Sequence, residues 1–323
     1  MSYRFQEAED LPAGVRRIAH EQLSHALDDL REMADPEQAV HDARKRCKKL
    51  RGLVRLIRPT IGDQYRTSNH TFRDAARLLA PYRDAHALLA CFDDLVMTHG
   101  HLMPDRSVGS VRDRLKWEAD AASLRLRGDT EAVEKAVGLL AQGRDLIERW
   151  QVSDRFSDLE GGLKKTYGRG VEAYHTVAGE AGPAGFHEWR KRVKYHWYHV
   201  RLLRNTAPAL LRRRASRLHD LSDGLGDGHD LHVLAQHVRS WDGMEPVDTR
   251  ACVVVAGGVR LELERRSIQV GARLFVEKPK RLVQRFSGWW GAWRRWGGEP
   301  EVGEMADMWN PTDEVERELS RER

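Results

Sequence analysis

The sequence contains an internal repeat, which limits the chain to folds built from two similar units. A basic motif that opens with His41 recurs without a gap 146 positions later, at His187. The equivalent residues are His41 and His187, Arg44 and Arg190, Lys45 and Lys191, Arg46 and Arg192, Lys48 and Lys194, Arg55 and Arg201, and Arg58 and Arg204. Self-similarity at a fixed offset is the signature of a repeated structural unit. We therefore divide the chain into two units, residues 1–153 and 154–296, followed by a tail, residues 297–323.

The repeat extends on both sides of the basic motif. After the motif, the same offset gives three further pairs of identical residues: Leu79 and Leu225, Asp84 and Asp230, and His86 and His232. Before it, GVRRIAHEQLSHAL from Gly14 aligns with GLKKTYGRGVEAYH from Gly162, with two more residues of offset. The extended match favours two units of similar fold.

Each unit is predicted to be helical. Residues 35–38, Asp-Pro-Glu-Gln, have the pattern of an N-cap, a first-turn proline and a capping-box partner. Pro59 ends the helix that follows, which is therefore expected over residues 37–58. Further breaks are expected at Pro81, Pro104, Pro183, Pro208, Pro246 and Pro279. The only β-like stretch is ACVVVAGGV at 251–259, and a single strand would have no partner, so the fold class is all α, in two helical bundles.

The basic residues of the repeated motif fall on one face of each helix. A helix advances 100° per residue, so the cations of residues 41–58 form a stripe opposite an apolar face. The apolar face of this first helix contains Ala43, Cys47, Leu50, Leu53, Val54 and Ile57. The second helix repeats the arrangement, with Trp189 and Val193 on its apolar face and Tyr198 placed among the cations.

The charge of the stripes is not balanced within them. Residues 41–59 contain eight Lys or Arg and one acid, Asp42. Like charges three or four residues apart on a helix repel by a few tenths of a kcal/mol per pair, so an external anion is expected. The tail, residues 297–323, holds nine acids and three arginines, a formal charge of −6, which leaves +11 on residues 1–296. A basic body predicts a polyanionic partner. The tethered acidic tail could compete with that partner for the basic surface, or it could be a solvating tail or a terminal helix packed elsewhere.

Composition favours a soluble cytoplasmic protein. The three cysteines, Cys47, Cys91 and Cys252, have neither a disulfide pattern nor zinc-ligand spacing, which is typical of a reducing compartment. The N-terminus lacks the apolar core of a signal peptide. The longest apolar run, at 251–256, is too short to cross a bilayer.

The repeated motif resembles that of the CHAD family, the conserved histidine α-helical domain. The resemblance rests on His41-x2-Arg44-Lys45-x2-Lys48 and its copy at 187–194, on Leu79-x3-Arg83-Asp84 with its copy at 225–230, and on GARLFVEKPKRL at 271–282. It covers most of residues 10–296. The second unit departs from the first at two positions, where His229 stands for Arg83 and Trp197 for Arg51.

The resemblance implies two pseudo-symmetric four-helix bundles that flank a central basic groove. It also implies that the groove binds long-chain inorganic polyphosphate without catalysis, cofactor or metal, possible associates being polyphosphate granules and polyphosphate-metabolising enzymes. The residues assigned to the groove are His41, Arg44, Lys45, Lys48, Arg51, Arg55, Arg58, Arg73, Arg77, Arg83, His187, Arg190, Lys191, Lys194, Tyr198, Arg201 and Arg204. Arg and Lys suit this ligand because their hydrogen bonds to phosphate oxygens are charge-assisted.

A nucleic-acid binder is the first alternative, because the same stripes would hold a DNA or RNA backbone. Trp197 and Tyr198 could then stack on bases. The sequence shows no helix-turn-helix, zinc finger or RNP-like motif, which disfavours this class.

A metal-dependent phosphohydrolase is the second alternative. The His-Asp pairs at 41–42, 219–220 and 229–230 are the basis for it, and His229 and His232 could share a metal. Adjacent residues diverge by 100° on a helix, and His41 lies among cations that repel a metal. Gly224-x-Gly226-x-Gly228 lacks the lysine and the preceding strand of a phosphate loop. The tryptophans of residues 289–296 form a stripe that is interpreted as core packing or a dimer contact rather than a ligand-stacking surface.

Overall fold

Helices make up all the regular secondary structure in the part of the chain that the computed structural model describes, residues 3–128, 130–179, 182–243 and 245–298. The helices are α1 (Leu11–Glu32), α2 (Pro36–Leu56), α3 (Gln64–Leu78), α4 (Ala80–His99), η1 (Gly100–Leu102), α5 (Asp105–Gly128), α6 (Thr130–Glu148), α7 (Ser157–Ala178), α8 (Pro183–Leu202), η2 (Arg204–Thr206), α9 (Pro208–Arg239), α10 (Pro246–Leu274) and α11 (Pro279–Trp296). The all-α prediction is confirmed. No helix in these ranges is long and apolar enough to cross a membrane. Beyond Gly298 the acidic tail lies outside the described residues.

Prolines define the helix boundaries. The Asp35 carboxylate caps α2 by accepting hydrogen bonds from two first-turn N–H groups at 3.1 and 3.2 Å. The helix ends at Leu56, two residues before the predicted end, because the residues that precede Pro59 are pushed out of helical geometry. The six other predicted breaks each lie at or next to the first residue of a helix. The β-like stretch 251–259 lies inside α10.

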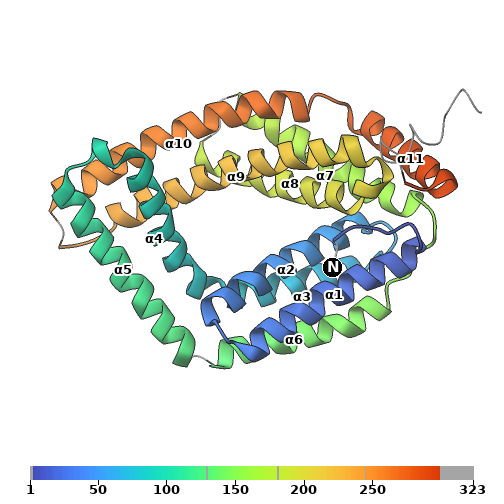
Figure 1. Cartoon of the computed structure of the whole chain (residues 1–323), viewed down its shortest axis with the longest axis horizontal. Helices are drawn as coiled ribbons and strands as arrows, with labels where there is room; N and C mark the ends of the chain where they lie inside the picture. The colour runs from blue at the N-terminus through green and yellow to red at the C-terminus, as the bar shows by residue number, and fades with distance from the viewer. Residues whose placement is uncertain (1–2, 129, 180–181, 244, 299–323) are drawn as a thin grey trace, which may run out of the picture.

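The first unit contributes a bundle of α1, α2, α3 and α6 (Figure 1). Its interior is apolar and includes Ile18, Leu53 and Phe72, all fully buried. The indole of Trp150, just after α6, is buried and donates a hydrogen bond to Ser68 Oγ at 3.0 Å. This bond fixes the end of α6 against α3.

The second unit contributes α7, α8, α9 and α10, with α11 packed beside α7 and η2. The tryptophans of α11 divide into two groups. Trp290 and Trp293 are buried and pack edge to face, and Trp290 also contacts Phe5. Trp296 is 79% exposed, so it is not part of the core, and a dimer contact at this residue stays a prediction.

The hairpin of α4 and α5 leaves the first bundle and reaches the far ends of α9 and α10 (Figure 1). A separate apolar cluster forms there, in which Phe92 and Val111 of the hairpin meet Leu234 and Cys252 of the second unit. The predicted boundary at 153/154 falls between α6 and α7, and the division into separate domains stays a prediction. The larger apolar core runs continuously through both units.

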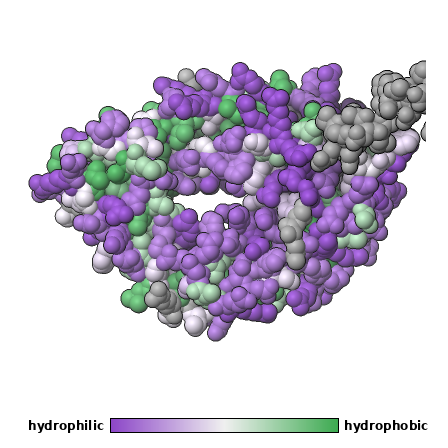
Figure 2. All heavy atoms as spheres, viewed as in Figure 1, coloured by the Kyte–Doolittle hydropathy of each residue, from purple (hydrophilic) through white to green (hydrophobic). Residues whose placement is uncertain are grey.

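The two units also meet where α2 crosses α8. At the crossing, buried His199 donates a hydrogen bond from Nε2 to the Gly52 carbonyl at 3.0 Å. Contacts at the crossing and at the α4–α5 hairpin close the molecule at two places. Figure 2 shows that an opening remains between them and that hydrophilic side chains line it.

Candidate anion-binding site

The two basic stripes come together around Lys48. This α2 side chain is exposed to solvent but lies near Arg44 of its own helix and Arg190 and Lys194 of α8. Desolvation in the concave site, followed by repulsion from these cations, lowers the pKa of Lys48 to about 8. Residues 146 positions apart in the sequence therefore share one electrostatic environment.

Lys194 has the same character. Desolvation is the main cause that lowers its pKa, and Arg190, Lys45 and Arg201 also disfavour its charged form. Asp223 of α9 opposes them, with its Oδ1 3.9 Å from Lys194 Nζ. Arg190 itself lies over Gly226 of α9, where a Cβ would be 2.9 Å from Nη2 of the guanidinium.

Aromatic rings support the cations near the crossing. The Arg201 guanidinium lies 4.7 Å from the Trp197 ring centroid and 5.4 Å from that of Tyr3. Lys49 Nζ lies 5.7 Å from the Tyr3 ring, and desolvation together with Arg201 lowers the pKa of Lys49 to about 8. Lys49 belongs to the basic surface although it was not among the predicted residues.

The histidines that open the two motifs have equivalent partners. Arg83 Nε donates to His41 Nδ1 at 3.3 Å, and the His187 ring lies 4.1 Å from the ring of His229, the repeat equivalent of Arg83. Desolvation is the main cause that lowers the pKa of both motif histidines, and neighbouring cations add to it. Desolvation and His187 lower the pKa of His229 to about 4. All three rings thus favour their neutral form.

Helix α3 holds several α2 arginines in place. Arg44 Nη1 donates to the Ala76 carbonyl at 2.5 Å. Asn69 Oδ1 accepts from Arg55 at 2.5 Å and from Arg51 at 3.3 Å. These contacts fix the guanidinium groups before any ligand arrives.

The structure places some predicted residues outside this convergence. Arg73 pairs with its neighbour Asp74 at 2.8 Å, and no contact joins Arg73 or exposed Arg77 to the second unit in the described ranges. Lys191 pairs with Glu188. Half-buried Arg204 has Arg4, Arg201 and Arg212 as its cationic neighbours.

The prediction that Tyr198 lines the groove is wrong. Its side chain is 2% exposed and packs on Tyr3 with ring centroids 5.8 Å apart. The residue lies at the crossing with α2, where no solvent space remains. Tyr195, three positions earlier on α8, faces the site instead, with its ring 4.0 Å from the Arg55 guanidinium.

The carboxylate of Asp230 has cations as its main neighbours in the site. Asp230 lies near Arg190, Arg83 and Lys48, and desolvation raises its pKa despite these cations. In the described part of the chain, no three His, Cys, Asp or Glu side chains are grouped closely enough to hold a metal ion. The proposed pairing of His229 with His232 therefore has no third ligand there.

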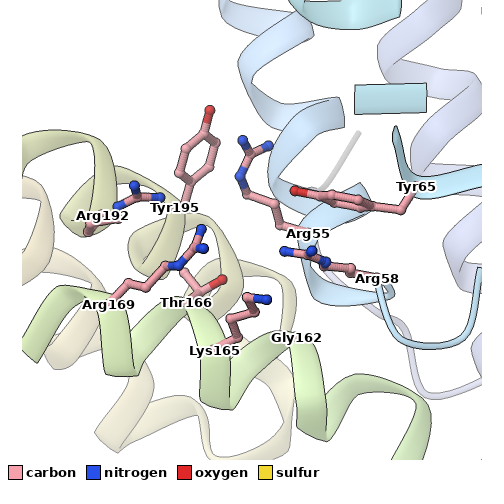
Figure 3. Close-up of a pocket in the computed structure, with 9 residues that line it drawn as sticks. All are labelled: Arg55, Arg58, Tyr65, Gly162, Lys165, Thr166, Arg169, Arg192 and Tyr195. Atoms are coloured by element: carbon pink, nitrogen blue, oxygen red, sulfur yellow. The ribbon is translucent and has the colours of Figure 1, made fainter. Parts of the chain in front are cut away.

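Sequence reasoning missed a cluster of cations between the end of α2 and helix α7 (Figure 3). The missed residues are Lys165, Arg169 and Arg192, together with the rings of Tyr65 and Tyr195. Lys165 and Arg169 lie outside the repeated basic motif, and only their four-residue spacing on one helix marks them in the sequence.

Together, the fold and the site define an all-α protein in which two basic helices meet around a hydrophilic opening. The sequence matches the model of the CHAD domain over residues 17–239, more than half of the chain, so the protein belongs to the CHAD family. Its fold is similar to that of PptA from Streptomyces chartreusis, with a TM-score of 0.58 and 14% identity over 82% of this chain and 100% of that chain. At that identity the similarity concerns the fold alone. No curated protein matches the sequence.

Proposed function

We propose that the protein binds inorganic polyphosphate along the basic surface formed by α2 and α8, and that it acts by binding rather than by catalysis. The observation that carries the proposal is the convergence of Lys48 with Arg190 and Lys194. Desolvation is the main cause of the lowered pKa of Lys48, and repulsion from Arg44, Arg190 and Lys194 adds to it. A polyanion in the opening would relieve this repulsion.

Membership in the CHAD family supports polyphosphate as the ligand. Polyphosphate is a flexible chain of phosphates without bases, so a track of cations with fixed directions is sufficient to bind it. Each well-made hydrogen bond from Arg or Lys to a phosphate oxygen contributes about 1.5–3 kcal/mol. Such a protein would collect on cytoplasmic polyphosphate granules or near enzymes that make or degrade the polymer.

The aromatic side chains disfavour nucleic acid as the main ligand. Proteins that bind single strands use free aromatic faces on which bases stack. Here the rings of Tyr195, Trp197 and Tyr65 each lie within 5 Å of an Arg or Lys charge, at 4.0, 4.7 and 4.3 Å. A cation therefore lies over a ring face on which a base would otherwise stack.

Two double variants test whether both helices form one site. Arg44→Gln with Lys48→Gln removes two charges from α2, and Arg190→Gln with Lys194→Gln removes the equivalent pair from α8. Each is expected to weaken long-chain polyphosphate binding at least about tenfold at fixed salt. The matched control is Lys116→Gln with Arg125→Gln, which removes two exposed charges from α5.

Calorimetric titration measures the affinities, and circular dichroism checks that each variant is folded. A folded variant of either pair that binds like the control would refute a shared site. Competition of bound polyphosphate by RNA at equal phosphate concentration separates the two ligands, and more effective displacement by RNA would favour the nucleic-acid alternative.

A further inference from the structure

The cation cluster between α2, α3, α7 and α8 lines a small pocket that is open to solvent (Figure 3). Its lining residues are Arg55, Arg58, Tyr65, Gly162, Lys165, Thr166, Arg169, Arg192 and Tyr195. None of the lining residues is acidic, and cations from both units point toward the same space (Figure 3).

A glycine brings the two units close enough to build this pocket. A Cβ on Gly162 would lie 1.9 Å from the Leu56 carbonyl oxygen, so α7 can pack against the end of α2 only with glycine at this position. Lys165 and Arg169 follow on the same face of α7. Arg58 is the main cause that lowers the pKa of Lys165, which places this amine in the field of the first unit.

The arginines of the pocket are oriented before a ligand binds. The Arg55 guanidinium lies 4.0 Å from the Tyr195 ring centroid and also donates to Asn69. The Arg58 guanidinium lies 4.3 Å from the Tyr65 ring. Fixing these groups in advance lowers the entropic cost of binding.

At the equivalent place on α1 the cation is paired. Arg17 and Glu21 of α1 occupy the positions equivalent to Lys165 and Arg169, and Arg17 pairs with Glu21 at 3.1 Å and with Glu9 at 2.6 Å. In the second unit an arginine replaces the glutamate, which removes the internal partner.

Most of the positive charge of the pocket has no ion-pair partner among the residues that the structure describes. In the described ranges no carboxylate lies within ion-pair distance of four of its cations, which are Arg55, Arg58, Lys165 and Arg169. Only the fifth, Arg192, is paired, with Glu188. Four unpaired cations around a small space, two of them held over aromatic rings, call for a small ligand of high negative charge.

We propose that this pocket binds the terminal phosphate group of an oligophosphate, such as one end of a polyphosphate chain. An internal phosphate of the chain has one ionisable oxygen, whereas a terminal phosphate has two, and the second ionises with a pKa near 6 in phosphate monoesters. The terminal phosphate therefore has more negative charge at neutral pH, and its electrostatic attraction to four cations is stronger. This assignment deepens the proposed function, since it gives the chain ends a site separate from the convergence around Lys48.

Triphosphate is the probe for the pocket, because most of its charge is terminal. Lys165→Gln and Arg169→Gln are each expected to weaken triphosphate binding about fivefold or more in calorimetric titrations at fixed salt. Arg169→Glu, which restores the charge pattern of the first unit, is expected to weaken it further. The matched control is Lys164→Gln, because Lys164 is exposed on the same helix and does not line the pocket.

A second experiment distinguishes chain ends from chain interior. Short polyphosphate with both ends blocked as phosphoramidates is expected to bind the wild-type protein more weakly than the free chain. The same blocking is expected to have no further effect in the Lys165→Gln, Arg169→Gln double variant, since the site that reads the ends is then lost. Circular dichroism confirms that the variants are folded.

Two outcomes would overturn the assignment. If the Lys165→Gln and Arg169→Gln variants bind triphosphate as tightly as the Lys164→Gln control, the pocket is not a phosphate site. Equal loss of affinity for blocked and free chains would show that the pocket binds chain interiors only. Failure of the proposed function is seen separately, as absence of long-chain binding to the wild-type protein, whereas the effect of Lys165→Gln and Arg169→Gln on triphosphate binding reports on the pocket.

Discussion

Gly52 of α2 lies directly against Tyr198 of α8, and the two residues occupy equivalent positions of the internal repeat. A Cβ on Gly52 would lie 2.9 Å from the Tyr198 Cβ. Equivalent positions contact each other where an approximate twofold axis passes between two units. The same relation accounts for the proximity of Lys48 to Lys194, its repeat equivalent. The crossing of α2 and α8 therefore determines how far apart the basic stripes lie.

Gly52→Ala tests this geometry. The added methyl has no room against Tyr198, so overpacking is expected to lower the free energy of unfolding by about 1–3 kcal/mol and to push the stripes apart, with weaker polyphosphate binding. Gly138→Ala in α6 is the control, because its Cβ would meet no atom within 4 Å and alanine favours a helix over glycine by about 1 kcal/mol. Denaturant unfolding measures both. If the Gly52→Ala protein is as stable as the control, the crossing has room for the added methyl group.

Sequence patterns predicted the local structure well, because helix caps, prolines and apolar periodicity act within a few residues. The break at Pro59 and the opposed faces of α2 follow from such rules. The gapless repeat also predicted that Lys48 and Lys194 would have related environments.

What sequence patterns missed depends on contacts between units. Nothing local shows that the α4–α5 hairpin packs on α9 and α10, or that Tyr198 is covered at the crossing. A helical wheel places Tyr198 among cations, but only the position of α2 decides which part of that face is solvated. Lys165 and Arg169 were missed because the pocket forms only when Gly162 meets the end of α2.

The salt dependence of binding is expected to be steep. If about six to eight phosphates are contacted, log K falls with log salt concentration with a slope near −4 to −6, at roughly 0.7 per contact as for single strands. Titrations of long-chain polyphosphate between low and high sodium chloride give the slope. A slope near −1 would mean that only one or two cations act, and the extended track would be wrong.

Histidine protonation is expected to strengthen binding at mildly acidic pH. Desolvation and neighbouring cations lower the pKa of His41 and His187 in the free protein. A bound polyanion reverses the local field and raises both pKa values, so binding takes up protons and tightens as pH falls below about 6.5. Terminal phosphates also titrate in this range, so the control is the His41→Gln, His187→Gln double variant. Identical pH profiles would remove the histidines from the binding mechanism.

Lysine deprotonation is expected to weaken binding at alkaline pH. Lys48 and Lys49 have pKa values of about 8, mainly because of desolvation. The polyanion stabilises the charged forms of both lysines. Their contribution to the binding affinity is therefore present below pH 8 and is lost as pH rises above 8, because the free protein then loses these protons. Replacing both by arginine keeps the charge. The Lys48→Arg, Lys49→Arg variant should therefore lose less affinity between pH 7.5 and about 9.5, and an unchanged profile would assign the loss to other groups.

The buried histidine at the crossing should make the fold sensitive to acid. Complete burial lowers the pKa of His199 to about 3, so the folded protein favours the neutral ring that donates to Gly52. Its contribution to stability is complete above the unfolded value of about 6.5 and is lost as pH falls from there toward 3, by roughly 2 kcal/mol at pH 5. Glutamine keeps an N–H donor but does not titrate, so His199→Gln should be less stable at pH 7 but should lose less stability on acidification. Urea unfolding at pH 7 and pH 5 measures the difference. Buried His196 remains in both proteins and contributes equally to each. Equal losses in variant and wild type would mean that protonation of His199 does not limit the stability of the crossing in acid.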